Sequence, residues 1–297
     1  MSDLKGKNII VTGASGGIGN SIIKKLYQNG ANILASGTKT EKLDELKDKF
    51  EKIKILKFDI SKSEKIEIDQ YGFIYHINKD NLVKFNKEGV PIYNYSNKLL
   101  GNITQLDISN PLRPLLFYKD QGIILALDNT LSLQKSEISL NELALYQTSC
   151  ISNSNFDNGI WLYDIDVNEV VKINHQAQVV FKSGNLSVIL PNMQFPILKL
   201  LEKNKKLYGV TSSQIIVLDQ YGSLLNTINL KATNGLIIKE ENLIGYDGNF
   251  IVNHNYLDYK LDTIYQTNSY DKIVQCQEEI IGILKGNSDA NSIFISK

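Results

Sequence analysis

Arginine is almost missing from this chain of 297 residues, because Arg113 is the only one among the 32 basic residues. The basic residues are balanced by 32 acidic ones, so the formal net charge at pH 7 is zero. Proteins that bind nucleic acid usually carry a basic surface, and arginine is the side chain that reads phosphate through paired hydrogen bonds. The composition therefore argues against nucleic acid as a partner.

Cysteine and long hydrophobic runs are scarce as well. The two cysteines, Cys150 and Cys276, show no Cys-x-x-Cys or Cys/His spacing, so neither a metal site nor a disulfide framework is indicated. The first residues lack the cationic and then apolar stretch of a signal peptide, and no run is long enough to span a bilayer. We therefore expect a cytoplasmic chain with reduced thiols and no membrane partner.

The first 63 residues alternate short apolar runs with helical periodicity. Strands are predicted at 8–11, 33–35 and 53–58, with a helix before Gly30 and a second one whose capping box is formed by Thr38 and Glu41. This order is typical of the parallel half of a doubly wound sheet, so the fold class of residues 1–63 is α/β, with a half-Rossmann βαβαβ unit.

Beyond residue 63 the pattern changes abruptly. All five prolines and every tyrosine except Tyr27 lie there, in short β-rich runs separated by Asn, Asp, Gly and Ser. Six hairpins begin at intervals of roughly 40 residues, the spacing of four-stranded propeller blades. Residues 64–297 are therefore predicted to form an all-β domain of about six blades. We expect the last blade to keep three strands, with residues 53–58 remaining in the parallel sheet.

A glycine-rich loop lies between the first strand and the first helix, with the sequence Thr12-Gly13-Ala14-Ser15-Gly16-Gly17-Ile18-Gly19. Backbone amides approach a pyrophosphate most closely where no Cβ intervenes, and a helix N-terminus adds a favourable field. The alternative is a glycine-rich turn that only packs the helix against the strand. In this strand-to-helix context we prefer a dinucleotide site.

The pattern T-G-x-x-x-G-I-G resembles the short-chain dehydrogenase/reductase family, in particular its 3-oxoacyl-acyl-carrier-protein reductases, over about residues 4–63. The resemblance implies that Gly13, Gly17, Ile18 and Gly19 hold the pyrophosphate. It also implies that Asp59 lies beside the adenine, although a solvated aspartate at a strand end is an equally good interpretation of that residue.

The second strand ends without a carboxylate that could bind a ribose 2′-hydroxyl, which favours NADP over NAD. Gly16 stands where many NADP-preferring relatives have an arginine. A 2′-phosphate would then be held by Ser15, Ser36, Thr38 and Lys39. Binding should be weak or vestigial, because the strands that hold the nicotinamide end in complete relatives are not present in the pattern.

No catalytic residue of the resembled family is found in place. The family needs a tyrosine with a lysine one helical turn away, and the matches Tyr75-x-x-x-Lys79 and Tyr256-x-x-x-Lys260 fall in predicted hairpins. The sequence Asp164-x-Asp166-x-Asn168 imitates a calcium loop, but it lacks the glycine and the closing glutamate, so a hairpin turn is the better interpretation. The three histidines are interpreted as surface or turn residues, and Trp161 as core between blades.

The later repeats resemble six-bladed β-propeller proteins, without the Trp-Asp signature of the best-known ones. We therefore predict a chimeric chain in which a propeller, acting as a binding or scaffold module, follows an incomplete NADP-binding segment and is not an enzyme. Its partners would be a dinucleotide and a protein or small-molecule ligand of the propeller. The alternative is an NADPH-dependent short-chain reductase whose missing residues are supplied in another way.

Overall fold

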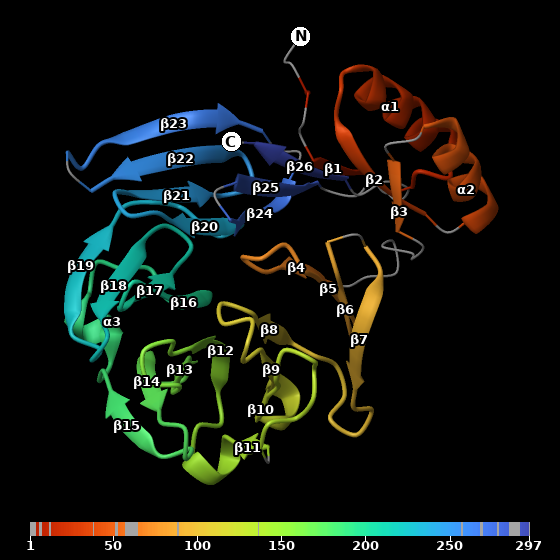
Figure 1. The fold of residues 1–297 in the computed structure, drawn as a ribbon. Helices are drawn as coiled ribbons and strands as arrows, with labels where there is room; N and C mark the ends of the chain where they lie inside the picture. Colours follow the sequence, from red (N-terminus) through yellow and green to blue (C-terminus); the bar gives the residue numbers. More distant parts are fainter. Residues whose placement is uncertain are drawn as a thin grey trace. The chain divides into compact units, whose positions relative to one another are not determined.

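The computed structural model of the protein describes most of the chain. It covers residues 4–5, 8–11, 13–37, 39–50, 53–56, 65–87, 89–135, 137–256, 258–267, 270–277, 279–284 and 292–296. These residues form mainly strands, with few helices (Figure 1). Within them, no helix combines the length and the apolar content that a membrane span requires.

The chain is divided into two compact units. The first unit combines Met1–Tyr95 with Asn268–Lys297, and the second is Ser96–Thr267. The predicted domains were 1–63 and 64–297, and the boundary between them lies outside the described residues. The first unit contains both ends of the chain because strands from the two ends share one sheet.

The N-terminal part of the first unit has the predicted strand–helix alternation. Its elements are β1 (Asn8–Val11), α1 (Gly17–Gln28), β2 (Asn32–Ser36), α2 (Thr40–Lys49) and β3 (Ile53–Leu56). Both neighbouring pairs are parallel, with Ile9 opposite Ile33 and Ile33 opposite Ile53. Parallel pairing follows from the helical crossovers, which return the chain to the same end of the sheet.

The start of α2 differs from the predicted capping box. The N-cap is Lys39, and no side chain caps the helix there. Thr38, the predicted cap, lies outside the described residues, while Glu41 is in the first turn as expected. A glutamate in the first turn still interacts favourably with the helix dipole.

The C-terminal strands continue the same sheet. These strands are β24 (Tyr270–Cys276), β25 (Glu279–Leu284) and β26 (Ser292–Ser296), and the six-stranded order is β24-β25-β26-β1-β2-β3. β3 stays in the parallel part, as predicted, but the expectation that the last repeat keeps three strands is wrong, because β1 pairs with β26. An unpaired strand edge leaves backbone N–H and C=O groups without partners. β1 and β26 each supply those partners to the other.

The two faces of the N-terminal strands pack against different partners. On one face, Ile23 of α1 and Leu43 of α2 are buried with Val11 and Ile33. On the other face, Leu34 of β2 joins a cluster whose further members come from β25 and from the sheet β4–β7; these include Ile66, Ile68, Ile74, Phe85, Ile281 and Ile283. The sheet β4–β7 therefore occupies the face for which the segment has no helices of its own.

Five four-stranded antiparallel sheets make up most of the remaining chain, and each is a meander of consecutive strands, the building unit of a propeller. The first, in the first unit, consists of β4 (Lys65–Ile68), β5 (Ile74–Asn78), β6 (Asn81–Phe85) and β7 (Pro91–Ser96). Five of the six predicted repeats thus form separate sheets, and the sixth is part of the mixed sheet.

The second unit contains the other four sheets. Their strands are β8 (Gln105–Asp107), β9 (Leu115–Tyr118), β10 (Ile123–Ala126), β11 (Ile138–Ser139), β12 (Thr148–Asn153), β13 (Ile160–Asp164), β14 (Glu169–Ile173), β15 (Val179–Lys182), β16 (Lys199–Lys203), β17 (Lys206–Val210), β18 (Ile215–Asp219), β19 (Leu224–Ile228), β20 (Gly235–Ile238), β21 (Asn242–Tyr246), β22 (Phe250–Asn255) and β23 (Leu261–Gln266). The short helix α3 (Leu186–Ile189) precedes β16.

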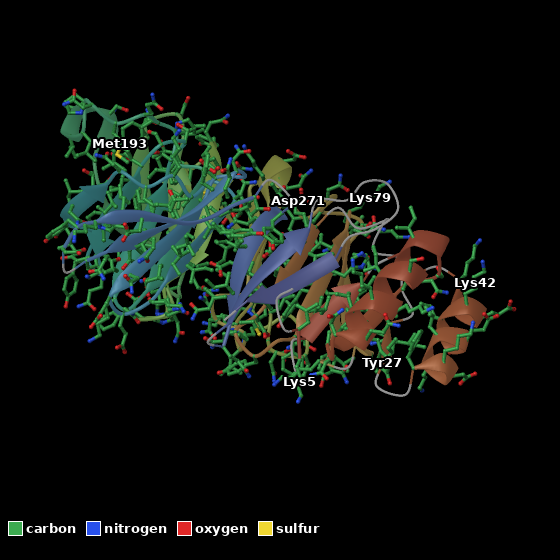
Figure 2. All side chains as sticks on the ribbon, turned by 90° about the horizontal axis from the view of Figure 1, so that it is seen from above. Lys5, Tyr27, Lys42, Lys79, Met193 and Asp271 are labelled. Carbon is green, nitrogen blue, oxygen red and sulfur yellow. The ribbon has the colours of Figure 1, made fainter. Side chains whose placement is uncertain are left out.

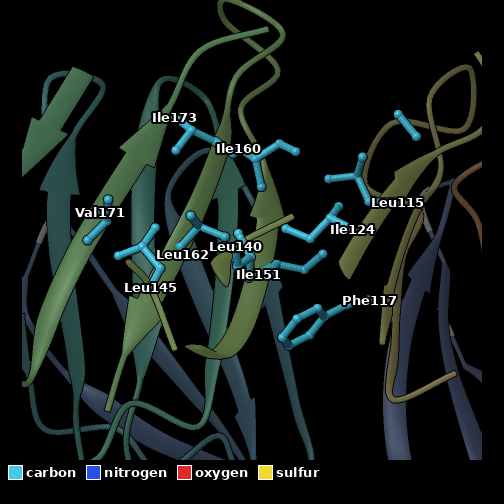
Figure 3. Packing of buried hydrophobic residues seen from close by; sticks show 11 residues of the cluster. Leu115, Phe117, Ile124, Leu140, Leu145, Ile151, Ile160, Leu162, Val171 and Ile173 are labelled. Carbon is cyan, nitrogen blue, oxygen red and sulfur yellow. The ribbon is translucent and has the colours of Figure 1, made fainter. Parts of the chain in front are cut away.

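Hydrophobic residues of successive sheets pack together in this unit. In one cluster, Leu115 and Phe117 of β9 lie with Ile160 and Leu162 of β13 (Figure 3). Trp161, on the alternate face of β13, is fully buried in a second cluster with residues of β16–β18, as predicted for a core residue between blades. The central strands of these sheets are apolar on both faces because both faces are buried.

A recurrent turn joins strands in several sheets. Asp69 Oδ1 accepts hydrogen bonds from the backbone N–H of Tyr71 (2.9 Å) and Phe73 (3.0 Å). The same sequence, Asp-Gln-Tyr-Gly, recurs at 219–222, where Asp219 makes the equivalent bonds. The fourth residue has a positive φ of 88° at Gly72 and 91° at Gly222, which glycine adopts without strain. These aspartates therefore explain part of the Asp/Asn richness of the repeats.

Candidate functional site

The glycine-rich loop lies at the end of β1, against the end of β2. Gly13 has a φ of 65°, and its carbonyl accepts a hydrogen bond from Gly16 N at 2.9 Å. Ala14 N donates to the carbonyl oxygen of Ser36, also at 2.9 Å. A Cβ placed on Gly37 would lie 2.6 Å from the Ser15 hydroxyl oxygen. The structure therefore brings Ser15 close to the end of β2, where the predicted 2′-phosphate contacts lie.

The glycines at the start of α1 have different roles. A Cβ on Gly19 would lie 2.3 Å from the carbonyl oxygen of Gly13, so only glycine allows the helix to approach the loop this closely. A Cβ on Gly17 would meet nothing within 4 Å, and the neighbouring Ile18 is 76% exposed. Gly19 thus serves packing, while Gly17 and Ile18 face open space at the helix start.

The first turn of α1 has the electrostatics of an anion site. Gly16 is the N-cap, no side chain caps it, and no acidic residue lies in the first turn. The first backbone N–H groups of a helix have no partners within the helix, and the helix dipole favours negative charge there. The loop and the helix start can therefore donate backbone hydrogen bonds to a phosphate group.

The other predicted cofactor residues are only partly placed. Ser36 is buried at the end of β2, and Lys39 is exposed at the N-cap of α2. Thr38 and Asp59 lie outside the described residues. Figure 2 shows the side chains of both helices, with Tyr27 labelled on α1; its ring centroid is 4.9 Å from that of Phe50. The roles of these residues in binding a cofactor stay predictions.

Neither tyrosine that matches the catalytic spacing has the required chemistry. Tyr75 lies on β5, and its hydroxyl donates to Asp69 Oδ2 at 3.2 Å; burial and the nearby carboxylate raise its pKa far above the ordinary value. The hydroxyl of Tyr256 lies 3.2 Å from that of Tyr208, and burial and this contact raise its pKa too. A general-acid tyrosine needs a lowered pKa, whereas the pKa of both these tyrosines is raised.

The remaining candidates from the sequence behave as turn or core residues. Asp164 Oδ1 accepts a hydrogen bond from Asp166 N (3.0 Å) within the β13–β14 turn, which confirms the hairpin interpretation. His175 is an exposed turn residue as expected. His254 was expected at the surface, but it is only 6% exposed. Its ring packs against Tyr256 with centroids 5.8 Å apart, and burial lowers its pKa.

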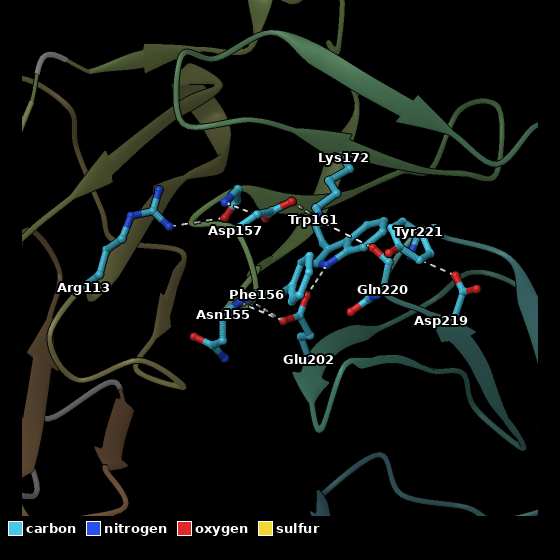
Figure 4. Close-up of polar contacts among 11 residues, drawn as sticks. Arg113, Asn155, Phe156, Asp157, Trp161, Lys172, Glu202, Asp219, Gln220 and Tyr221 are labelled. Carbon is cyan, nitrogen blue, oxygen red and sulfur yellow. Dashed lines mark hydrogen bonds and ion pairs between the residues drawn. The ribbon is translucent and has the colours of Figure 1, made fainter.

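A buried glutamate that the sequence patterns did not reveal anchors a loop of the second unit. Glu202 on β16 accepts hydrogen bonds from Trp161 Nε1 (2.6 Å), Asn155 N (2.7 Å) and Phe156 N (3.2 Å), as Figure 4 shows. Its side chain is 3% exposed. Oε1 thus ties the β12–β13 loop, and Oε2 ties Trp161 of β13, to the inner strand of the next sheet.

The same loop is held by two further charged side chains. Lys172 Nζ lies 2.8 Å from Asp157 Oδ2 and 4.6 Å from the centroid of the Trp161 ring. Burial would raise the pKa of Asp157, but hydrogen bonds, first among them that from Lys172, lower it overall. Arg113 donates to the carbonyl oxygen of Gly159 in this loop at 3.2 Å and to Asn153 Oδ1 at the end of β12 at 2.8 Å (Figure 4 shows the Arg113 side chain), and burial lowers the pKa of Arg113.

Further polar side chains link the inner strand β8 to the next sheet. Asp107 Oδ2 accepts from Asn153 N at 2.7 Å, and the Gln105 side chain bonds both backbone groups of Ile151. The Asp107 carboxylate is therefore hydrogen-bonded to the backbone of the next sheet. A useful signal in the sequence is a polar residue on an inner strand that is otherwise apolar, since burial there requires a partner.

Comparison with known proteins separates the two parts of the chain. Residues 7–70 match the family model of the short chain dehydrogenases. The 3-oxoacyl-acyl-carrier-protein reductase of Rickettsia bellii is 43% identical over 54 residues, which cover 17% of this chain and 22% of that protein. An uncharacterized oxidoreductase of Staphylococcus epidermidis is 36% identical over 81 residues, 25% of this chain and 35% of that protein. The chain thus spans about a fifth to a third of the length of these curated relatives.

Solved structures with a similar fold are propellers. The WD40 domain of Neurospora crassa Pan2 has a TM-score of 0.54 at 8% identity, over 75% of this chain and 72% of that one. Virginiamycin B lyase of Staphylococcus aureus has a TM-score of 0.52 at 12% identity, over 78% and 79%. At such identities the likeness concerns the fold alone. The chain therefore joins a propeller fold to a short, incomplete segment similar to short-chain dehydrogenases.

Proposed function

We propose that this protein is a propeller-based binding or scaffold module whose N-terminal segment keeps a pyrophosphate-binding loop but no reductase active site. The observation that carries the proposal is the strand beside β1. In a doubly wound sheet the fourth parallel strand lies there, and its loops hold the second half of the dinucleotide. Here the position is taken by β26, which runs antiparallel, with Val11 opposite Ser292.

An antiparallel strand at this position changes what a ligand can contact. The carboxyl ends of β1, β2 and β3 lie at the same end of the sheet, whereas the carboxyl end of β26 lies at the opposite end. The nicotinamide half of a dinucleotide therefore lacks its usual supports, while the amides after Gly13 remain for the pyrophosphate. We propose NADP as the ligand class, bound through its adenosine and pyrophosphate groups by Gly13, Ser15 and the first turn of α1, with Ser36, Thr38 and Lys39 at the 2′-phosphate.

We also propose a sixth blade, made of β24, β25, β26 and β1. The first three strands form an antiparallel meander like the other sheets, and β1 is the fourth. In this interpretation the dehydrogenase-like segment supplies the outer strand of the last repeat. The scaffold role is supported by the second unit, where Glu202, Lys172 and Arg113 are engaged in contacts between and within sheets.

Calorimetric titration tests the ligand proposal. NADPH and the fragment of it that lacks nicotinamide should bind with equal affinity, with a dissociation constant above about 1 μM, because only half of the contacts exist. Gly17→Trp, which places a large side chain at the open helix start, should abolish both. Sub-micromolar binding of NADPH but not of the fragment would contradict the proposal.

A reductase assay addresses the alternative function. We expect no loss of NADPH absorbance with an acetoacetyl thioester above the buffer blank, because the pKa values of Tyr75 and Tyr256 are raised rather than lowered. Turnover above the blank that is lost in Tyr75→Phe or Tyr256→Phe would establish the reductase and overturn the scaffold proposal.

A further inference from the structure

β1 lies between the antiparallel and the parallel parts of the six-stranded sheet. On one edge it pairs in parallel with β2, from Asn8 opposite Asn32 to Val11 opposite Ala35. On the other edge it pairs antiparallel with β26, with Ile9 opposite Phe294 and Val11 opposite Ser292. Backbone groups on both sides of β1 are therefore used, and the strand cannot shift toward one partner without loosening from the other.

The glycine-rich loop is rigidly connected to this strand. Gly13 follows Val11 after one residue, and the close approach of Gly19 to the Gly13 carbonyl fixes the start of α1 against the loop. Ala14 N also bonds the Ser36 carbonyl on β2. A change in the position of the helix start must therefore displace the end of β1, the part that pairs with β26.

Two further contacts join the C-terminal strands to the first four-stranded sheet. Lys272 Nζ on β24 lies 2.6 Å from Glu67 Oε1 on β4, and Gln277 N donates to the Gln70 carbonyl at 3.1 Å. Leu34 packs in the same cluster as Ile281 of β25. Segments from both ends of the first unit thus share a core and a sheet.

We propose that β1 couples the glycine-rich loop to the C-terminal strands, so that β1–β3, both helices and β24–β26 open and close as one cooperative unit. The dehydrogenase-like segment then acts as the closing element of the last repeat, and the packing of loop 13–19 controls the stability of β26. Native proteins open locally in contiguous groups of residues that unfold together. A strand shared by two such groups makes them unfold as one.

Hydrogen exchange of the full chain tests this coupling with two matched glycines. Gly19→Ala crowds the Gly13 carbonyl, whereas Gly17→Ala adds a methyl group where nothing lies within 4 Å. Gly19→Ala should raise exchange rates on the order of tenfold at 8–11 and by a similar factor at 292–296. Gly17→Ala should leave both segments unchanged, and β17 and β18 in the second unit serve as the internal reference.

The reverse perturbation starts at the other end of the coupling. Ile293→Pro removes the backbone N–H of a paired residue of β26, and Thr263→Pro makes the same change in β23, an outer strand of the second unit. Ile293→Pro should increase exchange along α1 and β2, while Thr263→Pro should not. The proposal is overturned if Gly19→Ala exposes only 13–30, or if Ile293→Pro acts only on β24–β26.

Two measurements on the wild-type chain keep the test independent of variants that fail to fold. In increasing sub-denaturing urea, exchange in 8–11 and 292–296 should converge on one common opening free energy; separate values would refute the coupling. A ligand arm rests on the function proposed above: NADPH that binds calorimetrically should slow exchange at 292–296, and binding without that effect contradicts the coupling. If no binding is detected, the ligand proposal fails, and the variants alone decide the coupling.

Discussion

Glu202→Gln is the sharpest test of how the second unit is held together. The carboxylate accepts three hydrogen bonds, one of them from the indole of Trp161. An amide of the same shape has one acceptor oxygen, so its NH₂ group must face either the indole N–H or the two backbone N–H groups of the β12–β13 loop. At least one buried donor is then left without a partner.

The expected cost follows from the number and charge of these bonds. Hydrogen bonds to charged groups contribute about 1.5–3 kcal/mol each, and an unsatisfied buried donor adds about 1–3 kcal/mol. We expect the free energy of unfolding to fall by about 2–4 kcal/mol. With a urea slope of about 2 kcal/mol per molar, the midpoint should move down by roughly 1–2 M.

Trp161 makes the assay local, because it is the only tryptophan in the chain. Urea unfolding followed by its fluorescence reports on the site of the change, and Glu142→Gln, at an exposed glutamate of the same unit, controls for loss of charge. A midpoint for Glu202→Gln equal to that of the control, with unchanged emission of the folded protein, would refute the reasoning that this carboxylate holds the loop.

Three further perturbations probe the same unit. Lys172→Met should lower the urea midpoint by the equivalent of about 1–3 kcal/mol and shift Trp161 emission, because the ion pair and the ring contact are lost; an unchanged spectrum would contradict the contact. In thermal melts, Gly222→Ala should lower the free energy of unfolding by about 2–4 kcal/mol, since its Cβ would lie 2.3 Å from the Phe181 ring. Gly101 has a similar φ but open space around it, so Gly101→Ala should lower the free energy of unfolding by only about 1 kcal/mol. Burial raises the pKa of the Cys150 thiol to about 12, above the ordinary value of about 8.5. The buried neutral thiol therefore contributes fully to stability below about pH 8.5, and this contribution is lost as the pH rises toward about 12. The urea midpoint should therefore fall less between about pH 8 and pH 10 in Cys150→Ala than in wild type, and equal slopes would argue against this thiol.

Much of the architecture could be predicted from periodicity. The helix before Gly30 and the strand at 8–11 lie where the patterns placed them. The predicted start of the second helix was less accurate, because propensity allows several N-caps and Lys39 was not among the expected ones. The glycine-rich loop was visible because its chemistry depends on local order along the chain, from strand through glycines to helix.

The candidate site was predictable only in part. The sequence placed Gly13, Gly17 and Gly19 in one loop, but only the coordinates show that Gly19 serves packing while Gly17 is open. The contacts of Glu202 with its three donors were not found, because the donors lie 41 to 47 positions away along the chain. Interactions over such separations leave no local pattern, so hydrophobic periodicity cannot detect them.

The amino-acid sequence by itself determined the local elements of this protein: a strand–helix–strand–helix–strand segment, a loop built from glycines, and repeated hairpins with Asp-Gln-Tyr-Gly turns. Those features depend on neighbours a few residues apart, whose spacing sets the helical or extended period. Only the tertiary structure decided that β1 pairs with β26 and that Leu34 packs with Ile281. Pairing between the two ends of the chain is decided by which strand edges and apolar faces remain uncovered once the local elements have formed.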